Sequence, residues 1–194
     1  MKRNVPPAHD LKLSHEWLRH EFGVRGRFRT ALRHATRCLD EIASYEPVFL
    51  SCKASSLACL ERWDDLADLL EASLRRYPSD PEIRCELASL FAAHGDWNNC
   101  WKQLVKAERL RDVLADRNTL DAFYCQKLEC LHAMGRTRAA IRLGQSVVKK
   151  NRRLTTTRIC LEHLKNGTLR FEPWVSERAK YLPRLRRVSN RGHR

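Results

Sequence analysis

Apolar residues recur at helical spacing in four stretches of this chain. Within each stretch, successive turns of the pattern stand three or four residues apart, as from Leu87 and Ala88 to Phe91, which places these residues on one face of an α-helix. The stretches contain Leu18 and Phe22; Leu50, Ala54 and Leu57; Leu87, Ala88 and Phe91; and Tyr124, Leu128 and Leu131. A second apolar stripe follows each of them, for example at Leu66, Leu69, Leu70 and Leu74. The alternating pattern of a β-strand is nearly absent, so the sequence predicts an all-α fold made of helix-turn-helix pairs.

These helix pairs repeat along the chain. Trp63 and Trp97 stand 34 residues apart in similar surroundings, each at the start of the second stripe of a pair. The same frame places Phe28 35 residues before Trp63, and Thr137 40 residues after Trp97, which gives four units. A period of this length is typical of helical solenoids, in which successive pairs stack and bury a continuous core.

The residues at the turns agree with this frame. Gly26, Gly95 and Gly135 stand where the first helix of a pair must end, a position at which a positive φ favours glycine. Asp80 precedes Pro81 at the start of the third unit, and this pair predicts a helix N-cap followed by proline in the first turn.

The four units resemble the tetratricopeptide repeat (TPR) family, whose motif runs W-x2-L-G-x2-Y, then A-x3-F, then P over 34 residues. The third unit matches it best, through Leu87, Ala88, Phe91, Gly95, Trp97, Leu104 and Ala107. In the fourth unit Thr137 stands at the bulky position and Gly144 at a later apolar one. The resemblance covers residues 12–150 and implies an α-solenoid of stacked antiparallel helix pairs, wound into a right-handed superhelix.

The repeat frame also divides the chain. The expected parts are an N-terminal extension (1–11), four repeat units (12–46, 47–80, 81–120 and 121–152), one further helix (153–166) and a C-terminal tail (167–194). The further helix is predicted by the apolar residues Leu154, Ile159, Leu161 and Leu164. Because a solenoid must end in an element with a polar outer face, we expect this helix to cap the stack.

The net charge of +14 lies mostly at the C-terminal end. Residues 149–194 contain 14 basic and 3 acidic residues, whereas residues 1–148 contain 23 basic and 20 acidic ones. Basic and aromatic residues alternate in this basic tail, at Arg170, Trp174, Arg178, Tyr181, Arg184, Arg186 and Arg187. The pattern is compatible with binding to nucleic-acid phosphates, to an anionic membrane surface or to a protein. The alternative is that Trp174, Val175 and Leu182 pack against the last repeat while the arginines are solvated.

The resemblance also implies where a partner would bind. In TPR proteins the first helices of the pairs line a concave groove, and the corresponding positions here are Glu16, His20, Ser51, Ser55, Cys59, Glu82, Cys85, Ser89, Cys125, Glu129 and His132. Some TPR proteins bind acidic chaperone tails through lysine, asparagine and arginine at such positions, and those residue types are absent from this set. A groove of small side chains favours a peptide or partner segment with apolar anchors, as in bacterial secretion chaperones. The alternative occupant is the chain's own segment from Val5 to Leu13.

Chemistry beyond binding has little support in the sequence. There is no C-x2-C pair among the eight cysteines, and most of them stand where a repeat needs a small apolar residue, so we expect free thiols, no metal site and a reducing, cytoplasmic compartment. No nucleophile elbow, phosphate-binding glycine loop or dinucleotide motif occurs. We therefore expect no cofactor and no enzymatic activity. The function predicted from the sequence is a protein-interaction adaptor or chaperone-like module, with nucleic-acid binding through the tail as the alternative.

Overall fold

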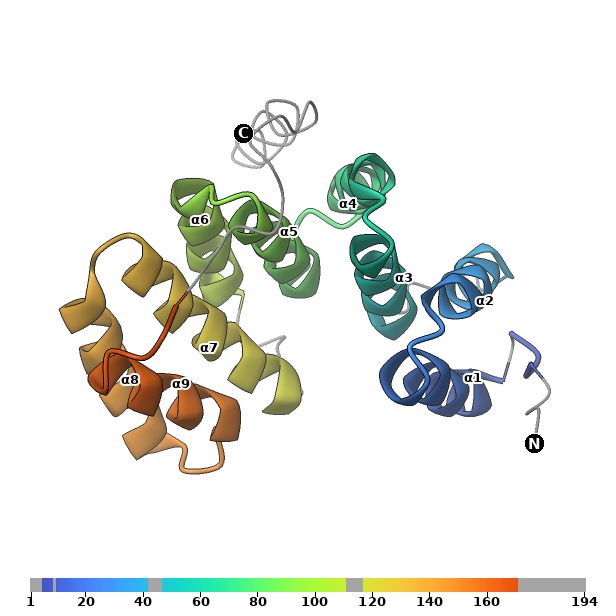
Figure 1. Ribbon diagram of the computed structural model, residues 1–194. Helices are drawn as coiled ribbons and strands as arrows, with labels where there is room; N and C mark the ends of the chain where they lie inside the picture. The colour runs from blue at the N-terminus through green and yellow to red at the C-terminus, as the bar shows by residue number, and fades with distance from the viewer. Residues whose placement is uncertain (1–4, 9, 42–46, 111–116, 171–194) are drawn as a thin grey trace. The chain divides into compact units, whose positions relative to one another are not determined.

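The computed structural model describes residues 5–8, 10–41, 47–110 and 117–170, and these residues form helices and no strand (Figure 1). The helices are α1 (Leu11–Leu18), the π-helical turn η1 (Arg19–Val24), α2 (Phe28–Glu41), α3 (Pro47–Cys59), α4 (Trp63–Arg76), α5 (Pro81–Ala93), α6 (Trp97–Arg109), α7 (Arg117–Ala133), α8 (Thr137–Lys150) and α9 (Thr155–Lys165). The all-α fold predicted from the sequence is confirmed.

The second helix of each pair begins at the residue that the repeat frame aligned with the tryptophans. These first residues are Phe28 in α2, Trp63 in α4, Trp97 in α6 and Thr137 in α8. The predicted N-cap is also present, since the Asp80 carboxylate accepts hydrogen bonds from the backbone N–H groups of Glu82 (2.8 Å) and Ile83 (3.1 Å).

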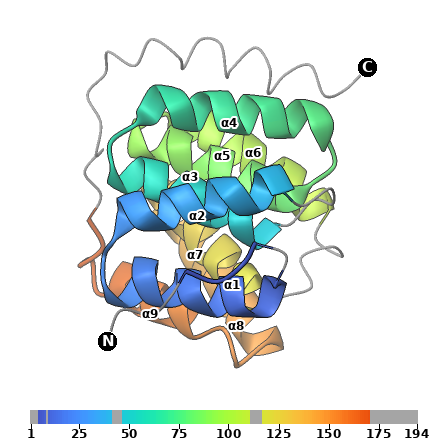
Figure 2. The same ribbon diagram turned by 90° about the vertical axis from the view of Figure 1, so that its right-hand side faces the viewer.

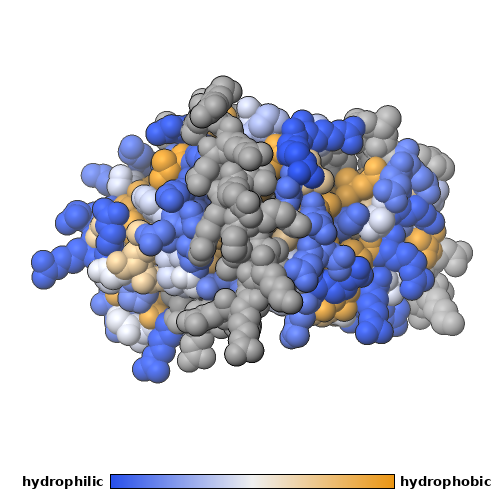
Figure 3. Space-filling view, turned by 90° about the horizontal axis from the view of Figure 1, so that it is seen from above, coloured by the Kyte–Doolittle hydropathy of each residue, from blue (hydrophilic) through white to orange (hydrophobic). Residues whose placement is uncertain are grey.

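Contacts between residues divide the chain into two compact units, Met1–Ala72 and Ser73–Arg194. In the first unit α2 packs against α3, and α1 lies beside α2, as Figures 1 and 2 both show. Its buried cluster contains Ala8, Trp17, Leu18, Ala31, Ala35, Cys38 and Phe49. In the second unit α5 packs against α6, and α7 packs against α8 and α9. Hydrophilic residues cover much of the described surface in Figure 3, with smaller apolar patches between them.

The first helices of the pairs, and α9, end in the same backbone motif. A residue with positive φ follows each of them: Gly26 (60°), Glu61 (56°), Gly95 (70°), Gly135 (75°) and Gly167 (66°). After α3, α5, α7 and α9 the next backbone N–H bonds back to the carbonyl five residues earlier, as from Asp96 to Phe91 (2.9 Å) and from Arg62 to Leu57 (2.9 Å). This is the Schellman arrangement, which satisfies the last carbonyls of a helix.

Glu61 is the one residue in this series that is not glycine, and it predicts a stabilising substitution. A left-handed conformation strains any residue with a Cβ, so Glu61→Gly is expected to raise the free energy of unfolding by about 1 kcal/mol. Urea denaturation followed by circular dichroism measures the change. Glu61→Ala is the matched control, because it removes the same side chain but keeps the Cβ. A glycine variant no more stable than the alanine variant contradicts the prediction.

The further helix predicted over residues 153–166 is observed as α9 (Thr155–Lys165). Its buried face consists of Thr157, Cys160, Leu161 and Leu164, and it packs against α7 and α8. Ile159, one of the apolar residues that predicted this helix, is instead 53% exposed. It points to solvent because the positions that face α7 and α8 are three and four residues apart and do not include 159.

The N-terminus of α9 is capped by a side chain from another helix. Its own N-cap residue, Leu154, provides no side-chain hydrogen bond. Instead, the carboxylate of Asp121 in α7 accepts hydrogen bonds from the backbone N–H groups of Thr156 (2.8 Å) and Thr157 (2.8 Å) and from the Thr157 hydroxyl (2.7 Å). Burial alone would raise the pKa of Asp121, but these hydrogen bonds hold it below its ordinary value. Asp121 thereby fixes α9 to α7.

Candidate functional site

The predicted groove residues of the first unit remain accessible to different degrees. Glu16 on α1 and Cys59 at the end of α3 are exposed, whereas His20, Ser51 and Ser55 are half-buried. The ring of His20 is held by its neighbour, because its Nδ1 lies 3.3 Å from Oε1 of Glu21.

Glu21 itself is a buried charge that the sequence analysis missed. It is 2% exposed, and its carboxylate pairs with Arg25 (2.9 Å) and Arg27 (3.3 Å). Burial would raise the pKa of Glu21, but the hydrogen bond with His20 and the two arginines lower it. The carboxylate is therefore ionised and ties η1 to the turn that precedes α2.

The N-terminal segment lies on its own unit. Arg37 of α2 donates a hydrogen bond to the carbonyl of Pro6, and the Ser14 hydroxyl donates one to the carbonyl of Pro7 (3.2 Å). Ala8 is buried in the cluster formed with α1 and α2. Pro6 thus contacts Arg37, which belongs to a second helix and not to the predicted groove positions.

A hollow in the first unit carries positive charge outside the basic tail. Its volume is about 530 Å³, and it is lined by Arg29, Leu32, Arg33, Thr36, Leu60 and Arg62. Arg62 also pairs with Asp65 at 2.8 Å. Arg29 and Arg33 are one helical turn apart on α2. The low net charge of residues 1–148 gave no indication of this local group of arginines.

In the second unit, α5 is accessible to solvent mainly at Ser89. Of the 13 residues of this helix, Ser89 is the only exposed one. Its hydroxyl donates to the carbonyl of Cys85 (3.1 Å) and accepts a hydrogen bond from Nε2 of Gln126 in α7 (2.8 Å). Ser89, Cys85 and Gln126 therefore form a wall shared by α5 and α7.

This wall is electrically neutral. Burial, assisted by the nearby acidic Glu86, Glu82 and Asp80, raises the pKa of the Cys85 thiol to about 12. The thiol is therefore protonated at neutral pH and acts as a small apolar group. Gln126 was missed by the sequence analysis, which placed its neighbour Cys125 in the groove.

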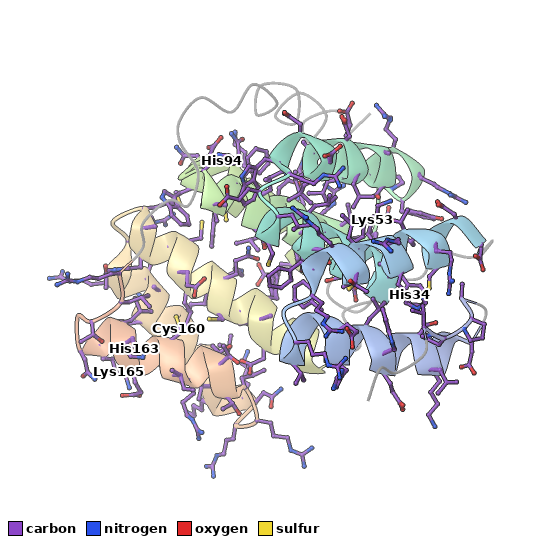
Figure 4. All side chains as sticks on the ribbon, turned by 45° about the vertical axis from the view of Figure 1, so that its right-hand side comes forward. His34, Lys53, His94, Cys160, His163 and Lys165 are labelled. Atoms are coloured by element: carbon purple, nitrogen blue, oxygen red, sulfur yellow. The ribbon has the colours of Figure 1, made fainter. Side chains whose placement is uncertain are left out.

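Cys125 and Glu129 lie next to each other one turn apart on α7, and α9 adds a third group. The Cys125 thiol donates to Oε1 of Glu129 at 3.5 Å, and Cys160 of α9, labelled in Figure 4, completes a cluster whose ligand atoms all lie within 4.8 Å of one another. Burial raises the pKa of Glu129. The hydrogen bond with Cys160, followed by burial, raises the pKa of Cys125. Two predicted groove residues thus meet a residue of the capping helix.

His132, the last predicted groove residue, has partners at both ring nitrogens. Nδ1 lies 2.9 Å from the Thr137 hydroxyl, and Nε2 lies 3.2 Å from the carbonyl of Leu169. Because a carbonyl oxygen can only accept, Nε2 carries the proton and donates it to Leu169. In the neutral ring Nδ1 then accepts a hydrogen bond from the Thr137 hydroxyl. His132 therefore holds the segment after α9 against α7.

The remaining predicted residues are placed as follows. Glu82 is half-buried on α5, and Arg170 is exposed. The other basic-tail residues, Trp174, Arg178, Tyr181, Arg184, Arg186 and Arg187, lie outside the described residues.

All eight cysteines are described and are free thiols. Only Cys38, Cys100, Cys130 and Cys160 are buried, and Cys59 is exposed. Among the described residues no helix is both long and apolar enough to cross a bilayer.

Comparison with solved structures agrees with the repeat pattern. A putative kinesin light chain from Podospora anserina, with nearly identical TPR-like repeats, is 16% identical in sequence, covers 100% of both chains and has a TM-score of 0.57. A mutant of MamA is 14% identical, covers 92% of this chain and 97% of its own, and has a TM-score of 0.48. No protein-family model matches the sequence, and no curated protein matches it. The protein has a TPR-like fold, as the sequence predicts.

Proposed function

We propose that this protein is a non-catalytic protein-interaction module, an adaptor or chaperone-like protein that binds a partner segment along the first helices α5 and α7. The observation that supports this best is the exposure of Ser89 on a helix whose other residues are buried or half-buried, beside the amide of Gln126. The TPR-like fold supports the same proposal, because solenoids present the faces of stacked helices as binding surfaces.

The hydrogen-bonding groups of this wall suit a peptide backbone. Ser89 uses its donor and one acceptor position within the protein, so one lone pair is left. The carboxamide of Gln126 has an oxygen acceptor and a second N–H beyond the bond to Ser89. These groups can pair with the N–H and C=O of an extended segment, while small side chains beside them contact its apolar residues.

The composition of the helices supports a partner of low polarity. The second helices α6 and α8 each have a charged or polar face, whereas α5 carries apolar or small residues at every position except Glu82, Arg84 and Glu86. Helices of that kind are normally covered on several sides. The proposed partner segment covers the side of α5 that Ser89 leaves open. Free thiols at all eight cysteines support a reducing, cytoplasmic compartment for this function.

Ser89→Glu tests this proposal. A charged side chain on the wall is expected to reduce capture of specific partner proteins at least about 10-fold, since burying an unpaired carboxylate costs more than 1.4 kcal/mol. Proteins captured from an extract of the source cells are quantified by mass spectrometry. Gln145→Glu places the same charge on the exposed face of α8 and is the matched control. Equal capture by both variants, with unchanged helicity, contradicts the proposal.

The alternative of nucleic-acid binding rests on the charge of residues 149–194. It predicts binding that weakens steeply with salt and is lost when residues 170–194 are deleted. Binding at the wall of α5 and α7 persists in both conditions, because hydrogen bonds and apolar contacts are little affected by salt. Repeating the capture at two salt concentrations, with and without the tail, separates the two functions.

A further inference from the structure

The cluster of Cys125, Glu129 and Cys160 joins two helices that are far apart in sequence. Cys125 and Glu129 occupy one face of α7, and Cys160 comes from α9. Cys160 is 4% exposed, while Cys125 and Glu129 are half-buried, so the cluster is open to solvent on the α7 side only. None of these residues takes part in the proposed contacts of Ser89 and Gln126.

The spacing of the ligand atoms matches a tetrahedral metal site. With zinc–sulfur and zinc–oxygen distances of about 2.3 and 2.0 Å, tetrahedral geometry separates a sulfur and an oxygen ligand by about 3.5 Å. Sγ of Cys125 lies 3.5 Å from Oε1 of Glu129. All three ligand atoms lie within 4.8 Å, so small rotations of the side chains bring them to one centre.

The carboxyl group of this cluster also has no cationic partner among the described residues. Glu129 is a half-buried carboxyl whose hydrogen-bond donor is a thiol, and among the described residues it forms no ion pair with lysine, arginine or histidine. Buried carboxylates are normally paired with a cation or bound to a metal. The nearby His132 does not supply this cation, because both its ring nitrogens are occupied by Thr137 and Leu169.

We propose that Cys125, Glu129 and Cys160 bind a zinc ion that links α9 to α7. Two thiolates and a carboxylate suit zinc, and a water molecule takes the fourth position on the exposed side. Binding transfers the two thiol protons to the solvent, so affinity rises with pH. The sequence analysis expected no metal, because these residues form no recognisable spacing motif.

Cobalt and zinc titrations of the reduced, full-length protein test the site. One equivalent of Co²⁺ is expected to give a thiolate-to-cobalt absorption band and the intense visible bands of tetrahedral cobalt, and zinc is expected to displace it. Zinc is also expected to raise the melting temperature. Calorimetry in two buffers of different ionisation enthalpy should show release of about two protons per zinc.

Variants identify the ligands. Cys125→Ser and Cys160→Ala are expected to abolish the stoichiometric cobalt band, and Glu129→Gln to weaken zinc affinity about 10-fold or more. Cys59→Ser, which removes an exposed thiol on α3, is the matched control and keeps full binding. Absence of the band in the unmodified protein overturns the proposal, and so does an equal band in Cys125→Ser. If a cysteine variant does not fold, unchanged zinc affinity in Glu129→Gln overturns this ligand set.

Discussion

Asp121→Ala is expected to lower the free energy of unfolding by about 3 kcal/mol. The substitution removes an N-cap, worth about 1 to 2 kcal/mol, and hydrogen bonds to a charged group, worth about 1.5 to 3 kcal/mol. It also leaves the N–H of Thr157, a completely buried residue, without its acceptor. Because the carboxylate joins α7 to α9, the loss should appear first in α9. Urea denaturation gives the global change, and hydrogen exchange shows whether α9 loses protection first.

The control for Asp121 is another acidic residue near the same helix. Among the described residues, Glu162 on the exposed face of α9 pairs only with Lys165, so Glu162→Ala should change stability by less than about 0.5 kcal/mol. Asp121→Asn keeps one carboxamide oxygen and should fall between the two. A loss no larger for Asp121→Ala than for Glu162→Ala contradicts the capping role.

The pKa of Asp121 adds a dependence on pH. A carboxyl whose pKa is lower in the folded state stabilises the protein above its unfolded pKa, which is 3.8 for aspartate, and this contribution is lost as pH falls through the lower folded value. The stability difference between the wild type and Asp121→Ala should therefore be constant near neutral pH and shrink in acid below about pH 4.

Gly144→Leu is expected to destabilise the protein by about 3 kcal/mol, at the upper end of the usual cost of overpacking. A Cβ at Gly144 alone would lie 2.9 Å from Cδ1 of Leu161 and 3.1 Å from Cδ1 of Leu128. The positions that correspond to Gly144 in α4 and α6 are Leu70 and Leu104, both buried. In the fourth pair the space for this side chain is filled by α9.

A double-mutant cycle tests whether Leu161 is what occupies that space. Gly144→Leu should cost less in a Leu161→Ala background than in the wild type, because the alanine leaves room for the new side chain. Gly144→Ala serves as the control, because its steric cost is much smaller than that of leucine. Its gain in helix propensity, about 1 kcal/mol, opposes that cost. Additive effects of the two substitutions would show that they do not share one space. Denaturant midpoints of the four proteins give the coupling energy.

The helices were predictable because the signals that define them are local. Apolar spacing gave the two stripes of each pair, and Trp63 and Trp97 marked the first residues of α4 and α6. Within the described ranges glycine occupies four of the five positive-φ positions, and three of these, Gly26, Gly95 and Gly135, were predicted as helix ends. Glu61 was missed because its conformation follows from the packing of the pair and not from its own preference.

The candidate site was predicted only in part. Ser89, Cys125 and Glu129 were placed on first helices, which the structure shows, but their partners Gln126 and Cys160 were not found. One signal was present: Cys160 follows Cys125 by 35 residues, close to the repeat period, and Cys160 is on the next helix equivalent to a first helix. Residues one period apart on stacked helices lie near each other, so the spacing could have suggested the pair.

The sequence by itself determined the all-α class, the order of the helix pairs, the first residue of each second helix, and the TPR-like repeat, because each depends on periodicity and turn residues within about 40 positions. Only the tertiary structure decided which side chains meet. Asp121 reaches Thr157 from another helix, Gln126 reaches Ser89, and Cys160 completes the cluster on α7. These contacts depend on the crossing angle and rotation of packed helices, which the matching of side-chain shapes sets and no single helix encodes.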